Sequence, residues 1–458
     1  MNSIKFGTVK NMNIKIYITA LFFFATASTL AQKAWTLDEC VAYAIENNLL
    51  VKNSSYTKDA SKETYRQSVR NLLPNVNAFT DYRINTGLTE DPQTGVLVNR
   101  EFNNANYSLS ANVDVFQGFQ KLNAIKAAKY ILRASEEDIV QEKFLLAFRV
   151  MSAYYDIKFN EGLVANSLEQ QDISQTNYDL VKRQVELGLM AEADLLEAES
   201  NLLNDKLLVT QNQNILALSK LTLLQEMNLT DTNDINLQLE EESNQEASVN
   251  QEVTVDSLYA TARTFVPIVK SQEYRVKAAK KQLQSTRGTL YPSLRVVAGM
   301  SSRFSETNTD DNDDVVPFSD QIGENFARFV GAELSIPLTN GWSNRSRVKQ
   351  QKIAYLQAKN NLKLQEQELF QLIQQLVQTH DALVVELGQS NKRVEAQEIA
   401  FQIAQKRYEK GLINAIELFQ AKNLFGTAQN ENLQVSLRLK VNESTIDFYK
   451  GLPIFNIN

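Results

Sequence analysis

The fold of this chain follows from the stretch Gln405-Lys406-Arg407-Tyr408-Glu409-Lys410-Gly411-Leu412-Ile413-Asn414-Ala415-Ile416-Glu417-Leu418-Phe419-Gln420-Ala421. It places a Gly-Leu pair inside a long helical pattern, with an acidic residue six positions after the glycine. The related stretch 181–198 repeats this arrangement with Gly188, Leu189 and Asp194. Because glycine lacks a Cβ, it adopts the left-handed backbone that ends a helix at little cost. Each stretch therefore predicts a tight turn between two long antiparallel helices.

The chain is a duplicated unit. An ungapped shift of 218 residues aligns identical residues of the two halves, among them Ala42 with Ala260, Val51 with Val269, Tyr56 with Tyr274 and Pro74 with Pro292. A period of this length is that of a whole domain rather than of a solenoid repeat. Each half opens with a helical pattern, at residues 36–73 and 254–290, that stops before a proline. Thr36 and Glu39 have the spacing of a capping box at the first of these starts.

After each proline the hydrophobic period changes to two. Four segments of about ten residues alternate apolar and polar side chains, at 76–84, 107–115, 294–300 and 330–336. Such alternation predicts strands, and this length crosses a bilayer as a tilted barrel strand. Since even small membrane barrels need about eight strands, several chains would have to pool theirs. On the strands alone, an ordinary soluble hairpin is an equal alternative.

Long helices follow the strands. Residues 119–187 and 342–410 are helical in pattern, roughly 100 Å each if fully helical, and shorter helices return at 191–227 and 414–450. Phe144, Phe148, Met151 and Tyr155 form an apolar seam, and two adjacent seams on 369–387 predict neighbours on two sides. Gly162 and Gly388 lie within the long helices, where a tolerated glycine is favoured over a break.

The first residues resemble a secretory signal. Lys10 and Lys15 precede an apolar run at 16–25, and small residues lead to a cleavage site after Ala31. Translation could start at Met1 or Met12. We therefore predict four segments: a signal peptide (1–31), a first repeat (32–230), an acidic linker (231–253) and a second repeat (254–458). Because no apolar run of about 18 residues follows, a membrane crossing would use strands, and the lack of a cysteine after Ala31 argues against a lipid anchor.

Composition argues against several functions. The formal net charge is −7, which disfavours nucleic acid as a partner. With one cysteine and one histidine, the chain offers no Cys/His metal cluster and no motif for catalysis, so we expect neither enzyme activity nor a cofactor. Cys40 is expected to be a small buried side chain and His380 a satisfied interface residue. The loop at 310–321 starts like a calcium loop, but Val315 replaces its glycine and Gln321 its glutamate.

The order of elements resembles that of the TolC family of outer-membrane efflux proteins. The resemblance covers nearly all of the chain after residue 31 and is carried by the two Gly-Leu turns, the exits at Pro74 and Pro292, and the opening stretch 35–40. It implies a protein that is mainly α with some β, in which duplicated long-helix hairpins form a periplasmic α-barrel. Four strands per chain would join a twelve-stranded outer-membrane β-barrel in a homotrimer.

The resemblance also implies functional residues. The tip of the helical barrel would dock a periplasmic adaptor, linked to an inner-membrane pump, through Gly188, Leu189, Gly411 and Leu412. The closed aperture would involve Asp194, Tyr408, Glu417 and Gln420. Asp194 and Tyr408 match a hydrogen-bonded gate pair, and Glu417 matches an aperture acid.

Two positions depart from the family pattern. Ile413 replaces a bridging arginine and Gln420 replaces a second acid, so the gate would be weaker or built differently. An acid near a helix N-terminus also stabilises the helix dipole. Lining the pore and capping the helix are equally good explanations of Glu417, whereas the structural role is favoured for Asp194. The expected function is an exit duct in the outer membrane, for efflux or type I secretion of small molecules or proteins. The alternative is a soluble periplasmic coiled-coil scaffold or adaptor.

Overall fold

The computed structural model describes residues 34–90, 94–99, 101–232, 234–238, 254–312 and 314–455. The predicted signal peptide and most of the predicted linker lie outside these residues. None of the described helices is both long enough and apolar enough to cross a membrane. The described chain forms two compact units, each assembled from both halves of the sequence. The first contains Lys143–Leu258, Ile373–Asn458 and the chain up to Val51, and the second contains Lys52–Glu142 and Tyr259–Leu372.

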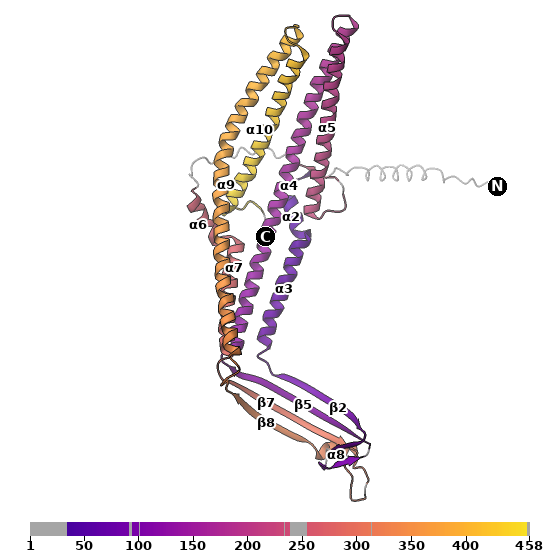
Figure 1. Ribbon diagram of the computed structural model, residues 1–458, viewed down its shortest axis with the longest axis vertical. Coiled ribbons are helices and arrows are strands. Elements are labelled where there is room, and N and C mark those ends of the chain that lie inside the picture. The colour runs from indigo at the N-terminus through magenta and orange to yellow at the C-terminus, as the bar shows by residue number, and fades with distance from the viewer. Residues whose placement is uncertain are drawn as a thin grey trace, which may run out of the picture. The chain divides into compact units, whose positions relative to one another are not determined.

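Two helical hairpins supply most of the first unit, and the first parts of their long helices, up to Glu142 and Leu372, belong to the second. Helix α4 (Gln120–Glu186) turns into α5 (Glu192–Met227), and α9 (Ser343–Glu409) turns into α10 (Ala415–Tyr449). Figure 1 draws α10 between α9 and α4, with α5 beyond α4. The contacts agree with this order: Asn432–Ser390 (3.0 Å) joins α10 to α9, Asn166–Asn430 (2.8 Å) joins α4 to α10, and Asn160–Ser219 (2.7 Å) joins α4 to α5. The predicted hairpins are thus confirmed, with ends within about two residues of those expected.

The main core of this unit lies where α2 (Leu37–Asn47) and the chain end pack on the hairpins. Buried side chains here include Cys40, Leu146, Tyr154, Ile157, Leu223 and Met227. The predicted seam on α4 faces this core, where the rings of Phe144 and Phe148 lie 4.7 and 5.1 Å from that of Phe448. Beside the core, β1 (Ala34–Trp35) pairs in parallel with β6 (Asn236–Leu237). The predicted capping box is present, with both Thr36–Glu39 hydrogen bonds at 3.2 Å.

The second unit contains a four-stranded antiparallel sheet, whose strands lie side by side in Figure 1. Its strand order is β2 (Asn75–Asn85), β5 (Phe102–Gln117), β7 (Ser293–Ser305) and β8 (Ala327–Ser335). The register pairs Ala78 with Leu109, Ala111 with Ala298 and Val296 with Ala332. Since side chains alternate along a strand, this register gathers the apolar residues of all four strands on one face. The four predicted strands are confirmed.

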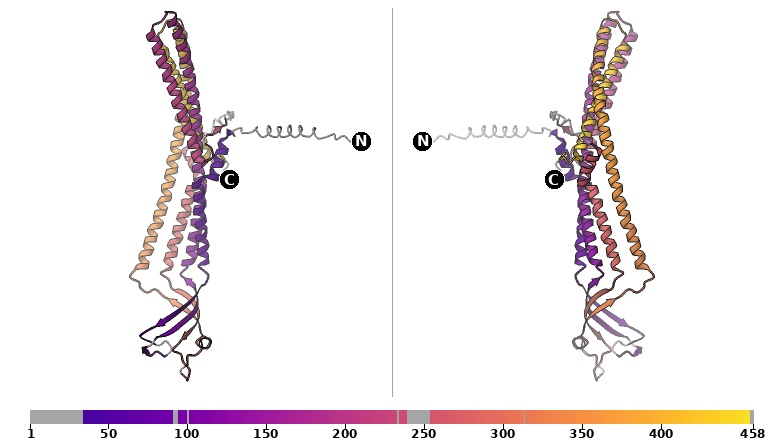
Figure 2. Two further views of the ribbon diagram at one scale, coloured as in Figure 1. Left: turned by 90° about the vertical axis from the view of Figure 1, so that its right-hand side faces the viewer. Right: turned by 90° about the vertical axis from the view of Figure 1, so that its left-hand side faces the viewer.

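Shorter elements complete the second unit. Helix α3 (Leu49–Arg70) leads towards β2, while α6 (Val255–Phe265) and α7 (Pro267–Gly288) lead towards β7. A hairpin of β3 (Leu88–Glu90) and β4 (Leu97–Asn99) and the short helix α8 (Phe318–Glu324) lie between the long strands in sequence. Figure 2 shows both at the end of the sheet remote from these helices. Strand β7 extends past β8, and there the fully buried amide of Gln321 exchanges hydrogen bonds of 2.9 and 3.0 Å with the backbone of Ser305.

Two predicted helices are each split in the structure. The pattern at 36–73 is interrupted at Asn48, whose extended backbone separates α2 from α3 and whose side chain accepts from the Leu50 N–H at 2.8 Å. The pattern at 254–290 is interrupted at Val266, because the following Pro267 disfavours helical backbone before it and starts α7 instead. The prediction of unbroken helices was wrong at both places.

The two long helices are continuous through Gly162 and Gly388, as predicted. At Gly162 there is also a packing reason for glycine. A Cβ built on Gly162 would lie 2.3 Å from a methyl carbon of Leu433, so α10 packs directly on the backbone of α4. A Cβ on Gly388 would meet nothing within 4 Å.

Candidate functional site

The two glycine turns of the first unit end their helices in the same way. Gly188 and Gly411 have φ of +72° and +71°. At the first turn, the N–H groups of Gly188 and Leu189 donate to the carbonyls of Val185 and Gln184 at 2.9 and 2.8 Å. At the second, Gly411 and Leu412 make the corresponding bonds at 2.8 and 2.9 Å. Both turns are therefore Schellman caps, in which the glycine conformation satisfies the last helix carbonyls.

Apolar side chains project from both turns. Leu189 is 73% exposed and Leu412 is 64% exposed, and Leu187 and Ile416 beside them are also exposed. Large apolar side chains that a fold leaves in water beside a rigid turn form a surface suited to another protein. The four residues predicted to dock an adaptor thus lie at the two turns.

The acids after the turns differ in what they contact. The Asp194 carboxylate accepts the backbone N–H of Ala191 at 3.2 Å, which satisfies one of the free donors at the start of α5. Asp194 therefore caps the start of α5, which is the structural role favoured for it from the sequence. At the start of α10, Asn414 takes the capping position, and its side chain accepts the backbone N–H of Glu417 at 2.9 Å. The carboxylate of Glu417 is exposed, as is Gln420 one turn further.

Tyr408 lies in the apolar cluster that packs the two hairpins together behind the turns. It is 8% exposed, and its neighbours in this cluster include Val181, Ala198, Phe401 and Leu418. Its hydroxyl has no hydrogen-bond partner within the described chain. Burial raises the pKa of Tyr408, and the nearby charges of Asp194 and Glu197 raise it further. Tyr408 and Asp194 are therefore close enough to interact electrostatically, but within one chain they share no hydrogen bond.

Ile413, which departs from the family pattern, packs against the same apolar cluster as Tyr408. An arginine at this position could reach an acid on a neighbouring helix, whereas an isoleucine contributes only burial. The sequence already contained this difference.

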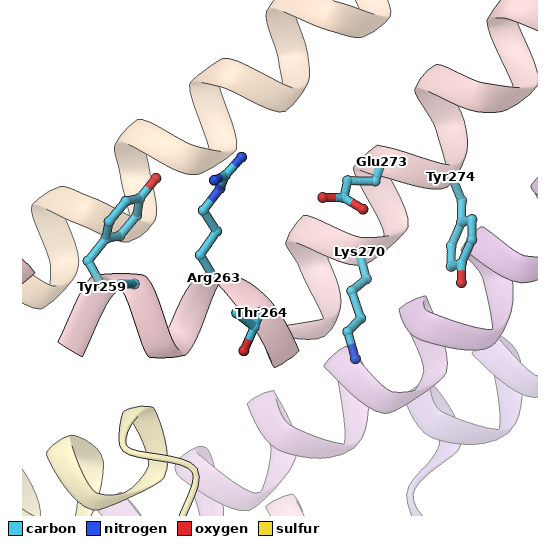
Figure 3. Close-up of a pocket in the computed structure, with 7 residues that line it drawn as sticks. Tyr259, Arg263, Thr264, Lys270, Glu273 and Tyr274 are labelled. Carbon is cyan, nitrogen blue, oxygen red and sulfur yellow. The ribbon is translucent and has the colours of Figure 1, made fainter. Parts of the chain in front are cut away.

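The second unit contains an open pocket of about 480 Å³ (Figure 3). Tyr259, Arg263, Lys270, Glu273 and Tyr274 are among its lining residues. The guanidinium of Arg263 is paired with Glu366 at 2.6 Å, and the ring of Tyr259 packs on Phe370. The pocket lining contains no histidine or cysteine. In the described part of the chain, no group of three or more His, Cys, Asp or Glu residues could hold a metal ion.

Sequence comparison identifies relatives over most of the chain. The profile of the outer membrane efflux protein family matches residues 41–229 and 258–452. The probable outer membrane lipoprotein SilC of Salmonella typhimurium is 21% identical over 403 residues, covering 88% of this chain and 83% of SilC. The toluene efflux pump outer membrane protein TtgC of Pseudomonas putida is 22% identical over 431 residues, covering 91% and 82%.

Solved structures share the fold. CusC superposes with a TM-score of 0.77 at 16% identity, covering 93% of this chain and 96% of CusC. The outer membrane protein VceC of Vibrio cholerae superposes with a TM-score of 0.75 at 14% identity, covering 91% and 96%.

Paired long-helix hairpins, a four-stranded sheet and the family match together define an efflux protein of the outer membrane. The chain belongs to the outer membrane efflux protein family, whose profile matches both halves of the duplication. The family resemblance, the mainly α fold with some β, and the outer-membrane location predicted from the sequence are thereby confirmed. The soluble periplasmic scaffold is not supported, because the family consists of outer-membrane proteins.

Proposed function

We propose that three copies of this chain assemble into the exit duct of a tripartite efflux system. The observation that carries this proposal is the sheet of the second unit, whose edge strands β2 and β8 each pair on one side only within the described chain. These edge strands run in opposite directions, since each neighbouring pair is antiparallel. The β8 edge of one copy can therefore pair with the β2 edge of the next, and three copies supply twelve strands, enough to close a barrel.

The two faces of the sheet support a membrane position. One face carries exposed apolar side chains from all four strands: Val76, Tyr82, Ile84, Leu109, Met300, Val330 and Leu334. The opposite face is mainly polar, with Asp81, Asn106, Ser110 and Arg295 among its residues. An apolar outer face and a polar inner face are typical of barrels that enclose a water-filled passage in lipid.

Exposed apolar residues in the first unit support the same assembly. Helices α9 and α5 are the outer members of its four-helix layer (Figure 1). Val384, Val385, Ile399 and Ile403 are exposed on α9, and Leu203, Leu207, Ile215 and Leu218 on α5. A head-to-tail contact between α9 of one copy and α5 of the next would bury both sets and close a ring.

The two turns would face the rest of the efflux system. Gly188, Leu189, Gly411 and Leu412 would dock the periplasmic adaptor, which joins the duct to an inner-membrane pump. Asp194, Tyr408, Glu417 and Gln420 would surround the aperture. The exposed carboxylate of Glu417 would be repeated in each copy, and a ring of acids in a narrow passage favours cations. The unpartnered Tyr408 hydroxyl would remain available for a gate contact.

The duct would carry its cargo without chemical change. The names of the relatives refer to toluene, antibiotics and cations, so one architecture serves chemically different cargo. We propose small molecules or proteins selected by the pump, and no enzymatic activity or cofactor in this chain.

The native mass of the protein extracted from outer membranes with mild detergent tests the assembly. We expect a homotrimer that needs detergent for release and conducts ions in planar bilayers. A monomer or dimer released without detergent would contradict the shared barrel.

A further inference from the structure

A buried polar cluster in the first unit is not accounted for by the proposed duct. Lys422 of α10 is 2% exposed and forms an ion pair with Asp205 of α5, which is 6% exposed. The Lys422 ammonium also donates to the Ser174 hydroxyl of α4 at 2.7 Å and to the Gln170 carbonyl at 3.5 Å. Ser174 in turn donates to Asp205 at 2.5 Å. The three ammonium protons thus have three acceptors on two other helices.

The cluster interrupts an apolar seam. Leu418 and Phe425 flank Lys422 on α10, and Leu202 and Val209 flank Asp205 on α5, all four being buried. A buried ion pair is weak evidence for stability, because apolar residues of similar volume often pack as well or better. The best attested role of such a pair is to select one alignment of the helices.

The spacing of the seam shows which misalignment the cluster would prevent. Sliding α10 along its neighbours by one helical turn, about 5.4 Å, would bring Lys422 level with Leu202 or Val209. Phe425 or Leu418 would then lie level with Asp205, so the ammonium and the Asp205 carboxylate would each be buried against apolar side chains without a counter-charge. That arrangement is strongly disfavoured.

Close packing next to the cluster acts in the same direction. Gly426 lies one turn after Lys422, and a Cβ there would lie 3.2 Å from the side-chain amide of Gln170. Helix α10 therefore approaches α4 closely at the level where Lys422 reaches across.

We propose that Lys422, Asp205 and Ser174 are positioning residues that fix the axial register of the α9–α10 hairpin against the α4–α5 hairpin. They thereby set the relative height of the turns at Gly411 and Gly188. Lys422 lies seven residues after Ala415, the first residue of α10, or roughly 10 Å along the helix, so a shift at the cluster moves the second turn with it. The effect of this register on the aperture rests on the proposed function, whereas the register itself does not.

Distances between the turns test the proposal directly. Spin labels are attached to cysteines replacing Leu189 and Leu412, which are both exposed, in a Cys40→Ala background. Labelled chains are diluted with unlabelled chains, so that each assembly contains at most one labelled copy. We expect a single narrow distance in the parent. In the double variant Lys422→Met/Asp205→Leu we expect a second distance population, because a slip of one helical turn moves the label at position 412 by about 5.4 Å along the helix axis.

The double variant separates positioning from stability. Lys422→Met alone leaves Asp205 buried and unpaired, and it should unfold more readily or fail to fold, whereas the double variant should regain thermal stability. If the pair only stabilises the fold, the double variant should also show the single narrow distance of the parent. That result would overturn the proposal. Arg393→Met is the matched control, because the Arg393–Glu431 pair joins α9 to α10 but is exposed, and it should leave the distance unchanged.

Ion conductance of the same variants tests whether the register affects the aperture. We expect a higher closed-state conductance in the double variant, because its second turn is no longer held at one height. If no preparation of the parent conducts, the duct itself fails as a function. The spin-label distances would still decide whether the cluster fixes the register.

Discussion

The side chain of Asn414 accepts the backbone N–H of Glu417 at 2.9 Å, so the start of α10 is capped without using the Glu417 carboxylate. That carboxylate is exposed and free to act on ions. We therefore predict that Glu417→Lys lowers cation selectivity, with a reversal potential in a salt gradient shifted towards that of chloride and Glu417→Gln in between. Asn414→Ala is the control: it should cost about 1 kcal/mol of stability and leave selectivity unchanged. An unaltered reversal potential in Glu417→Lys would remove this residue from the pore lining.

Gly411→Pro should abolish export while the protein still inserts into the outer membrane. Proline cannot adopt the φ of +71° found at this position, and it lacks the N–H that donates to the Tyr408 carbonyl. The sheet belongs to the second unit and is not altered by the substitution, so detergent-resistant oligomers should form in normal amounts. Growth in the presence of a toxic efflux substrate measures export. Normal resistance in this variant would contradict the assignment of the docking tip. Gly411→Ala should be milder, because its Cβ has open space around it and only the backbone strain remains.

Alanine should have opposite effects at the two glycines inside the long helices. At Gly162 it collides with Leu433, and we expect a net loss of about 1 kcal/mol after the gain in helix propensity. At Gly388 nothing is in the way, so the propensity gain of about 0.5–1 kcal/mol should appear alone. Thermal unfolding of the two variants measures this. Equal shifts of the same sign would contradict the close approach of α4 and α10, and Leu433→Ala should relieve the loss at Gly162.

Tyr449 should make the folded protein sensitive to alkali. Burial raises its pKa from 10.0 to about 12. Above pH 10 the unfolded chain therefore releases this proton while the folded chain retains it, so stability falls as the pH rises towards 12. The loss from this group is at most roughly 2–3 kcal/mol. Thermal unfolding at pH 9 and pH 11 should show a smaller drop for Tyr449→Phe than for the parent. Tyr56→Phe, at an exposed position, should not differ from the parent.

Local patterns predicted the elements of the fold well. Alternation with a period of two identified all four long strands, and the glycine turns were placed correctly because only a few backbone conformations end a helix. The two unpredicted helix breaks had different causes. Pro267 could have predicted the break at Val266. It was missed because its counterpart in the first half, Leu49, is a good helix former. Asn48 gives little warning, since its side chain is held by the distant carbonyl of Glu226 at 3.0 Å.

The candidate site was predictable only in part. Exposure at the turns follows from the turns themselves, and the capping role of Asp194 follows from its spacing. The buried position of Lys422 could not be predicted. In sequence it is one of two lysines in α10, and its acidic partner lies 217 residues away. Long-range pairing of this kind depends on how whole hairpins pack, which no local pattern records.

The duplication has a consequence for any protein that binds the tip. The turns at Gly188 and Gly411 share a backbone geometry, but Met190-Ala191-Glu192 follows the first and Ile413-Asn414-Ala415 the second. An assembly of three copies would present six quasi-equivalent turns of two chemical kinds in alternation. A ligand that recognises the backbone shape would bind with a stoichiometry of two per chain, and one that reads the side chains would bind with a stoichiometry of one.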